Sequence, residues 1–225
     1  MRAAFTLLCW FFVLSGFTQS DKQLLSEPSL NLGYKLSSEY KLNVGLSSRQ
    51  LFREKEGFDG NVSGYEYLHS DVSADLSRDV GLNNKIQVGY LLRQTEDGRI
   101  HRLRQRFTIV RNHNALRLSH RFGTEQTFSF NEDTEYRARY RIAPEIALAG
   151  LVVDPEEFYL KATNEFVVAR QGNDSDIEIR VSPNVGYLFT SGLKLESGVT
   201  YRFDEFLDTN GRHRLFFGLS GYYNF

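Results

Sequence analysis

In the sequence Arg212-His-Arg-Leu-Phe-Phe-Gly-Leu-Ser-Gly-Tyr-Tyr-Asn-Phe225, the size and polarity of the side chains alternate from one residue to the next. The odd-numbered positions from Leu215 to Phe225 are mostly large and apolar, whereas the even-numbered positions are mixed and begin with Arg214. Successive side chains of a β-strand point to opposite faces, so this pattern predicts a strand with one apolar face. A closing strand that ends on its own aromatic residue is typical of an outer-membrane β-barrel.

The same alternation recurs from about residue 29 to the end of the chain. Strict alternation over a dozen residues does not produce the 3.6-residue stripe of a helix. We therefore expect an all-β fold, a single closed antiparallel transmembrane β-barrel over residues 29–225. Clear examples of the pattern are Leu30-Leu32-Tyr34-Leu36, Ile86-Val88-Tyr90-Leu92 and Tyr136-Ala138-Tyr140-Ile142.

The number of strands is predicted only as a range of 10 to 12. Eleven candidate strands can be found, but bacterial single-chain barrels have an even number. Residues 30–36 and 40–46 could form one long strand, because their apolar phase is unbroken, and the total would then be 10. Alternatively, Ser37-Ser38 is a turn between two strands, and a twelfth strand remains to be found.

The first twenty residues are predicted to be a cleaved signal peptide. Arg2 supplies a positive start, residues 5–14 are apolar but too short to span a bilayer, and a small, polar segment follows up to Ser20. Cys9, the only cysteine, lies inside this segment between bulky neighbours, so we expect no lipid attachment and no disulfide. Residues 21–28 are then expected to form an N-terminal lead to the barrel.

The charge balance argues against a nucleic-acid-binding protein. Loss of residues 1–20 removes only one charged residue, Arg2, and leaves slightly more acidic than basic residues in the chain. The remaining chain has no apolar run long enough for a transmembrane helix. It also has no His, Asp or Glu grouping with metal-ligand spacing, so we expect no cofactor. Its expected partners are outer-membrane lipid and the outer-membrane assembly machinery.

The connections between candidate strands alternate along the chain between two kinds. Outer-membrane barrels have longer outside loops and shorter periplasmic turns. We therefore expect the polar set to lie outside the cell, comprising Arg53–Asn61, Glu96–Arg99, Ser129–Thr134, Gln171–Ser175 and Asp204–Arg212.

The opposite phase of the strands predicts a charged lumen. Arginine can pair through two hydrogen bonds with carboxylates or phosphates. A narrow barrel must fill its interior, so ion pairs alone explain the pattern and predict an occluded lumen with a structural or narrow-pore role. The excess of arginine favours a second hypothesis, a selective porin for small anionic solutes. The expected network comprises Arg102, Arg104, Arg106, Arg117, Arg121, Glu125, Glu135, Arg137, Arg139, Arg141, Glu165, Glu178, Arg180, Glu196 and Arg202.

A third hypothesis is an outer-membrane enzyme that modifies lipids. Such barrels use Ser-His pairs near the outer rim. His113 falls in a predicted periplasmic turn, and His120 falls in the lipid-facing phase. His69-Ser70-Asp71 cannot form a triad, because neighbours on a strand point to opposite faces. We therefore expect no catalytic residues and regard an enzyme as the weakest of the three hypotheses.

Three segments resemble an uncharacterised family of Gram-negative outer-membrane barrels, domain of unknown function 2490. They are His120-Arg-Phe-Gly-Thr-Glu-Gln126, Tyr136-Arg-Ala-Arg-Tyr-Arg-Ile142 and Phe158-Tyr-Leu-Lys-Ala-Thr-Asn-Glu-Phe166. The resemblance covers roughly residues 29–225 and implies export to the outer membrane, but no activity. The final strand also resembles the signal recognised by the assembly machinery, with Tyr223 and Phe225 in its apolar places and Ser220 where that signal has glycine.

Overall fold

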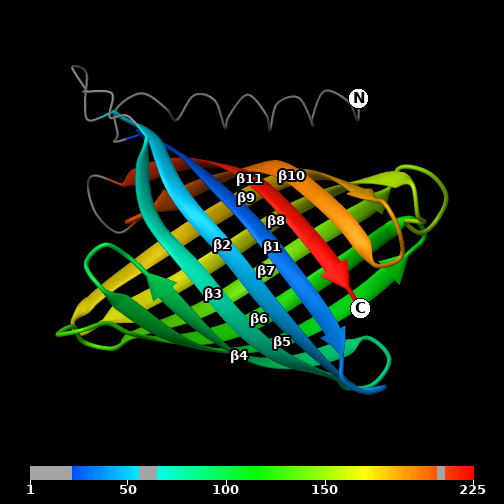
Figure 1. Ribbon diagram of the computed structural model, residues 1–225, viewed down its shortest axis with the longest axis horizontal. Helices are drawn as coiled ribbons and strands as arrows, with labels where there is room; N and C mark the ends of the chain where they lie inside the picture. The colour runs from blue at the N-terminus through cyan, green and yellow to red at the C-terminus, as the bar shows by residue number, and fades with distance from the viewer. Residues whose placement is uncertain (1–21, 56–64, 207–210) are drawn as a thin grey trace.

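The computed structural model describes residues 22–55, 65–206 and 211–225. Strands occupy most of these residues, and none of the described residues is helical (Figure 1). The eleven strands are β1 (Lys22–Lys35), β2 (Tyr40–Lys55), β3 (Glu66–Asp79), β4 (Asn84–Gln94), β5 (Arg99–His113), β6 (Leu116–Phe128), β7 (Glu135–Ala147), β8 (Glu157–Gln171), β9 (Asp174–Leu188), β10 (Leu193–Asp204) and β11 (Arg212–Asn224).

The strands form one closed barrel in which each strand pairs with the strands before and after it in the sequence, and β1 pairs with β11 to close the barrel. All of these pairs are antiparallel except the closing pair, β1 with β11, which is parallel from Lys22 opposite His213 to Gly33 opposite Asn224. In an up-and-down barrel with an odd number of strands, the first and last strands run in the same direction. The all-β closed barrel and the range of 10 to 12 strands are confirmed by the eleven described strands. The expectations of an even count and of a purely antiparallel arrangement are wrong, because the closing pair is parallel.

The beginning of the barrel also differs from the expectation. Leu36 and Ser37 donate backbone hydrogen bonds to the Tyr40 carbonyl at 3.0 and 3.2 Å, so a turn separates β1 from β2. The alternative of one long strand is therefore wrong. β1 begins at Lys22, so most of the expected lead at residues 21–28 belongs to the first strand. The predicted signal peptide lies outside the described residues.

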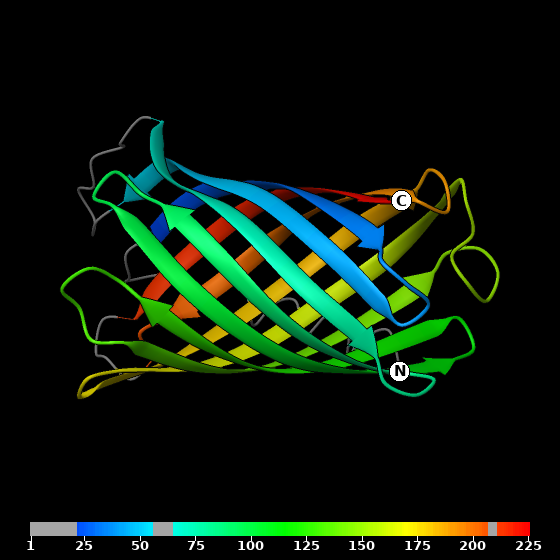
Figure 2. The ribbon, with the colours of Figure 1, turned by 60° about the horizontal axis from the view of Figure 1, so that its bottom comes forward.

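The two predicted sets of connections lie at opposite ends of the barrel (Figure 2). The turn end holds residues 36–39, 80–83, 114–115, 148–156 and 189–192, together with Phe225. The loop end holds residues 65, 95–98, 129–134, 172–173, 205–206 and 211, whereas residues 56–64 and 207–210 lie outside the described residues. The lengths of the two sets overlap, since the connection 148–156 is longer than 172–173.

The outer face is apolar and the inner face is polar, which is the inverse of a water-soluble domain. Phe122 and Phe166 point outward and are 47% and 45% exposed, whereas Glu165 and Glu196 point inward and are each 4% exposed. The pattern follows from the alternation of the strands, because each places every second side chain in the lumen. None of the described residues forms a helix long and apolar enough to cross a membrane.

Two register shifts break the alternation near the loop end. Leu24 lies opposite Arg53 but Leu25 lies opposite Leu51, so Phe52 is an extra residue in β2. A second shift lies between Arg49 and Gln50, in the pairing of β2 with β3. A bulge changes the face on which the following residues lie.

Candidate functional site in the barrel lumen

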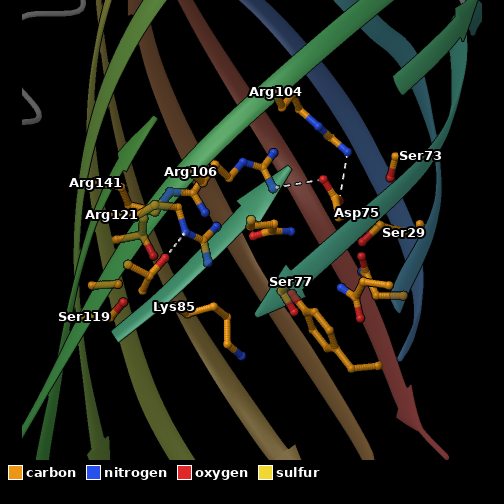
Figure 3. Close-up of a pocket in the computed structure, with 18 of the residues that line it drawn as sticks. Ser29, Ser73, Asp75, Ser77, Lys85, Arg104, Arg106, Ser119, Arg121 and Arg141 are labelled. Carbon is orange, nitrogen blue, oxygen red and sulfur yellow. Dashed lines mark hydrogen bonds and ion pairs between the residues drawn. The ribbon is translucent and has the colours of Figure 1, made fainter. Parts of the chain in front are cut away.

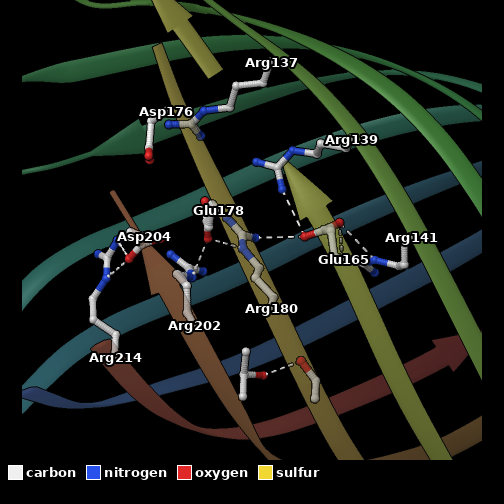
Figure 4. Close-up of polar contacts among 12 residues, drawn as sticks. Arg137, Arg139, Arg141, Glu165, Asp176, Glu178, Arg180, Arg202, Asp204 and Arg214 are labelled. Carbon is white, nitrogen blue, oxygen red and sulfur yellow. Dashed lines mark hydrogen bonds and ion pairs between the residues drawn. The ribbon is translucent and has the colours of Figure 1, made fainter. Parts of the chain in front are cut away.

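A belt of arginine and carboxylate side chains crosses the middle of the lumen (Figure 4). Glu125 on β6 pairs with Arg139 at 2.9 Å and with Arg102 at 3.8 Å. Glu178 on β9 pairs with Arg202 at 2.8 Å and also with Arg180. These contacts tie β5, β6 and β7 together, and they also tie β9 to β10. We use the term belt for Arg102, Glu125, Arg139, Arg141, Glu165, Glu178, Arg180 and Arg202.

Glu165 is the centre of the belt. It accepts contacts from Arg139 at 3.2 Å, Arg141 at 3.0 Å and Arg180 at 3.1 Å, and its side chain is 5% exposed. Removing a carboxylate from water is costly unless opposite charges and hydrogen-bond donors surround it. Three guanidinium groups supply both, so the belt holds side chains from β7, β8 and β9 across the interior.

Asp75 extends the pairing to β3, next to the belt. It lies 2.9 Å from Arg104 and 3.6 Å from Arg106, two inward residues of β5. Gly89 on β4 makes room for this carboxylate, because a Cβ at that position would lie 1.8 Å from Asp75 Oδ1. The absence of a side chain at residue 89 thus allows Asp75 to serve two arginines.

An apolar cluster lies inside the barrel toward the loop end, and we call it the plug. It consists of Leu25, Leu51 and Phe216, with Leu68 packed against them. The guanidinium groups of Arg49 and Arg202 stack on the Phe216 ring, with centroid distances of 4.8 and 4.5 Å. Cation–π contacts of this kind join the plug to the belt through Arg202. The plug and the belt therefore lie next to each other in the lumen between the middle of the barrel and the loop end.

On the turn-end side of the belt, the lumen contains a polar cavity of about 620 Å³ (Figure 3). Serine, threonine and asparagine side chains form part of its wall, but its charge is unbalanced. Four carboxylates line it, and two of them, Glu27 and Asp71, already pair with Arg49 and Arg93 outside the wall. Nine cations line it: Lys41, Lys85, Arg104, Arg106, Arg117, Arg121, Arg141, Lys161 and Lys194. Four of these also pair with carboxylates outside the wall, Lys85 with Asp79, Arg141 with Glu165, and both Lys161 and Lys194 with Glu196.

A second carboxylate centre lies next to this cavity and pairs with two of its lining lysines. Glu196 accepts contacts from Lys161 at 2.8 Å and Lys194 at 3.3 Å, and the Tyr159 hydroxyl donates to it at 2.7 Å. Tyr159 fits there because Gly186 has no side chain, since a Cβ at that glycine would lie 2.1 Å from the ring. Glu196 therefore belongs to a separate lysine and tyrosine centre and not to the arginine belt.

The structure divides the residues of the predicted charge network into several groups. Arg117 lies at the turn end, half exposed, with Glu145 at 3.5 Å. Glu135 and Arg137 pair with each other at 2.7 Å near the loop end. Among the described residues, no carboxylate pairs with Arg121. The remaining predicted residues face the lumen in the belt, at Asp75 or at Glu196.

Several lumen residues were not anticipated from the sequence. Most of them are polar residues in the inward phase of their strands, so the phase alone could have identified most of them. Phe216 is different, because no pattern predicts that an aromatic residue will be inside a charged lumen. The missed residues are Glu27, Arg49, Asp71, Asp75, Arg93, Lys194, Asp204, Arg214, Tyr159 and Phe216.

Histidines on the outer face pair with tyrosines of neighbouring strands. His120 lies 2.9 Å from the Tyr140 hydroxyl, and His101 lies 2.5 Å from that of Tyr90. Each pair satisfies two polar groups on an otherwise apolar face. Over residues 22–55, 65–206 and 211–225, no group of three or more His, Cys, Asp or Glu side chains is arranged to hold a metal ion.

The proposed assembly residues lie on the outer face at the turn end. Tyr223 and Phe225 are 40% and 67% exposed, and their rings meet edge to face with centroids 4.6 Å apart. The Phe225 amide donates to the Gly33 carbonyl at 2.9 Å, which continues the parallel seam beyond β11. Both rings are therefore accessible, as a recognition signal requires.

Comparisons with known proteins give one match. Neither the curated proteins nor the solved structures include one that matches this chain. A family profile described as a protein of unknown function, DUF2490, matches residues 29–213, which span β2 to β10 completely and parts of β1 and β11. The match covers most of the chain, and the chain belongs to the DUF2490 family.

Proposed function

We propose that this protein is an integral outer-membrane β-barrel of a Gram-negative bacterium, exported with a signal peptide at residues 1–20. The distribution of its side chains supports this location. Aromatic and aliphatic residues cover the outer face, as lipid requires, and the charged residues are buried inside. Its partners would be outer-membrane lipid and, during insertion, the assembly machinery that recognises Tyr223 and Phe225. We assign it no reaction and no cofactor.

We further propose that the lumen is closed toward the loop end, so that the barrel is structural or at most a narrow pore. The observation that carries this proposal is the position of Glu165, which holds arginines from β7 and β9 in the middle of the lumen. The plug lies beyond this point, with Leu25 and Phe216 almost completely buried. Both features support a lumen without the continuous wide water path of a general porin.

The test is a planar-bilayer recording with purified protein. We expect no steady current on the nanosiemens scale at any holding voltage. Insertion must be shown independently, by flotation of proteoliposomes and by the altered electrophoretic mobility of the unheated barrel. A steady nanosiemens current from inserted wild-type protein would overturn the closed lumen.

A selective anion path is a second candidate function. The excess of cations in the wall of the 620 Å³ cavity favours it, because rings of arginine and lysine attract anions in pores. If the barrel passes small currents, their reversal potential in a KCl gradient should follow chloride. A cation-selective current would exclude this candidate and leave the structural role.

A further inference from the structure

We propose that the lumen cavity contains a binding site for a soluble, multiply charged oxyanion of the phosphate class, formed by Arg106, Arg121 and Arg141. The three residues belong to the adjacent strands β5, β6 and β7, and all three line the cavity (Figure 3). This inference goes beyond the proposed function, because it concerns what the closed lumen holds and not whether it conducts.

The positive charge of the three arginines is only partly compensated by carboxylates. Arg121 has no carboxylate partner among the described residues, and it donates a 3.4 Å hydrogen bond to the Thr108 hydroxyl. Arg106 shares Asp75 with Arg104, and Arg141 shares Glu165 with two belt arginines. None of the three guanidinium groups therefore has a carboxylate of its own. Positive charge in a confined, partly dehydrated space is unfavourable without an anion.

The strand register places the three arginines close together. Arg121 lies directly opposite Arg141 in the pairing of β6 with β7. Like charges at facing positions of a sheet destabilise it unless something lies between them. Arg106 lies opposite Gly123, and a void of about 50 Å³ lies between the same three arginines, Gly123 and the belt residues Glu125, Arg139 and Glu165. The three arginines therefore lie along one wall of the lumen, on adjacent strands, with open space beside them.

The same part of the cavity is rich in hydrogen-bond donors. Each guanidinium group carries five N–H donors in a planar fork that matches the oxygens of a phosphate or carboxylate. The hydroxyl groups of Ser119 and Thr108 also line the cavity and can donate to an oxyanion. Three forks favour an anion with several oxygens and more than one charge. The site lies inside the lumen, so the ligand is a soluble anion and not a lipid headgroup.

The test uses purified full-length barrel in a zwitterionic detergent, with inorganic pyrophosphate as the probe. Isothermal titration should show binding to wild-type protein that sodium chloride of equal ionic strength does not reproduce. Arg121→Gln should weaken the binding roughly tenfold or more, because one charge-assisted set of hydrogen bonds is lost. Arg121→Lys, which keeps the charge but loses the fork, should weaken it less.

Arg111→Gln is the matched control for the loss of one positive charge. Arg111 is an exposed residue near the turn end of β5 and does not line the cavity. Its replacement should leave the dissociation constant for pyrophosphate within about twofold of wild type, an effect below about 0.4 kcal/mol. Equal losses in Arg111→Gln and Arg121→Gln would show attraction by overall charge only and would overturn the proposal.

Urea unfolding distinguishes the anion site from a purely structural role of Arg121. Without anion, Arg121→Gln should unfold in urea at the same concentration as wild type or higher, because a guanidinium without its own counter-charge is removed. Pyrophosphate should raise the midpoint of wild type clearly more than that of Arg121→Gln, because the variant binds it more weakly. A variant that is less stable without anion, or wild type that binds no pyrophosphate, would overturn the site. Neither result depends on the conductance measurement, which tests the closed lumen separately.

Discussion

Phe216 and Phe217 are adjacent residues of β11, and their side chains lie in opposite environments. Phe216 points into the lumen and is 2% exposed, packed against Leu25 and Leu51, whereas Phe217 points outward and is 48% exposed. A strand allows this because successive side chains leave it on opposite sides. The pair provides two chemically identical probes, one for the plug and one for the lipid-facing surface.

Phe216→Ala should weaken the plug. The change removes buried apolar surface, leaves a cavity and deletes two cation–π contacts, so we expect the variant to be less stable than Phe217→Ala by about 1 to 2 kcal/mol. Phe216→Ala should also show brief current steps in planar bilayers that Phe217→Ala lacks. Urea unfolding in lipid vesicles and bilayer recordings check both expectations. Identical currents and stabilities would exclude a sealing role for the plug.

Glu165→Gln should destabilise the barrel strongly. The substitution leaves Arg139, Arg141 and Arg180 without their shared carboxylate, and breaking a buried ion pair costs about 3 to 5 kcal/mol. Glu39→Gln is the control, because the Glu39 pair with Arg78 is half exposed and such pairs contribute about 1 kcal/mol or less. Arg139→Ala should behave like Glu165→Gln. Urea midpoints of the three variants measure the difference, and similar small shifts in all of them would contradict a structural belt.

Gly89→Ala should disturb the lumen although it adds only one methyl group. The new Cβ would collide with Asp75, so Arg104 and Arg106 would lose their carboxylate, and we expect a loss of about 2 kcal/mol. Gly218→Ala is the matched control on β11, because its Cβ would lie 3.8 Å from the nearest heavy atom. Urea unfolding compares the two variants. Equal stability of both would mean that Asp75 can move without consequence.

The sequence predicted most of the architecture, because lipid and lumen impose alternating polarity on every strand. Residues such as Arg139 and Glu165 were placed in the lumen by phase alone. Their contact was not predictable, because Arg139 lies opposite Val167 and reaches Glu165 diagonally across the strands. Strand tilt and side-chain length decide such pairs, and neither is visible in a one-dimensional pattern.

The errors in the prediction have identifiable causes. An even strand count is needed only when the first and last strands pair in antiparallel fashion. The parallel seam between β1 and β11 removes this need. The plug escaped detection because Leu25, Leu51 and Phe216 are apolar residues at inward positions of their strands, where the alternation predicts polar side chains. The beginning of β1 was missed because Pro28 interrupts its polarity pattern, although this residue still pairs with Leu219 in the seam.

Deleting Tyr223–Phe225 should block assembly in the outer membrane. The deletion removes two exposed rings at the turn end and the hydrogen bond from the Phe225 amide to β1. Asn224→Ala is the control, because it keeps both rings. Membrane fractions should contain folded, heat-modifiable barrel for the control and not for the deletion. Normal amounts of folded barrel from the deletion would exclude these residues as an assembly signal.

The central claim is that odd and even side chains of each strand face different surroundings, lipid outside and a closed polar lumen inside. Trp10 is the only tryptophan in the chain, so a Trp10→Phe background allows single tryptophans to be placed at will. Tyr222 lines the lumen cavity, and its neighbour Tyr223 is exposed on the outer face at the same depth. The most direct measurement is quenching by brominated lipids of vesicle-inserted Tyr222→Trp and Tyr223→Trp proteins. The account predicts strong quenching for Tyr223→Trp and little for Tyr222→Trp, and equal or reversed quenching would contradict it.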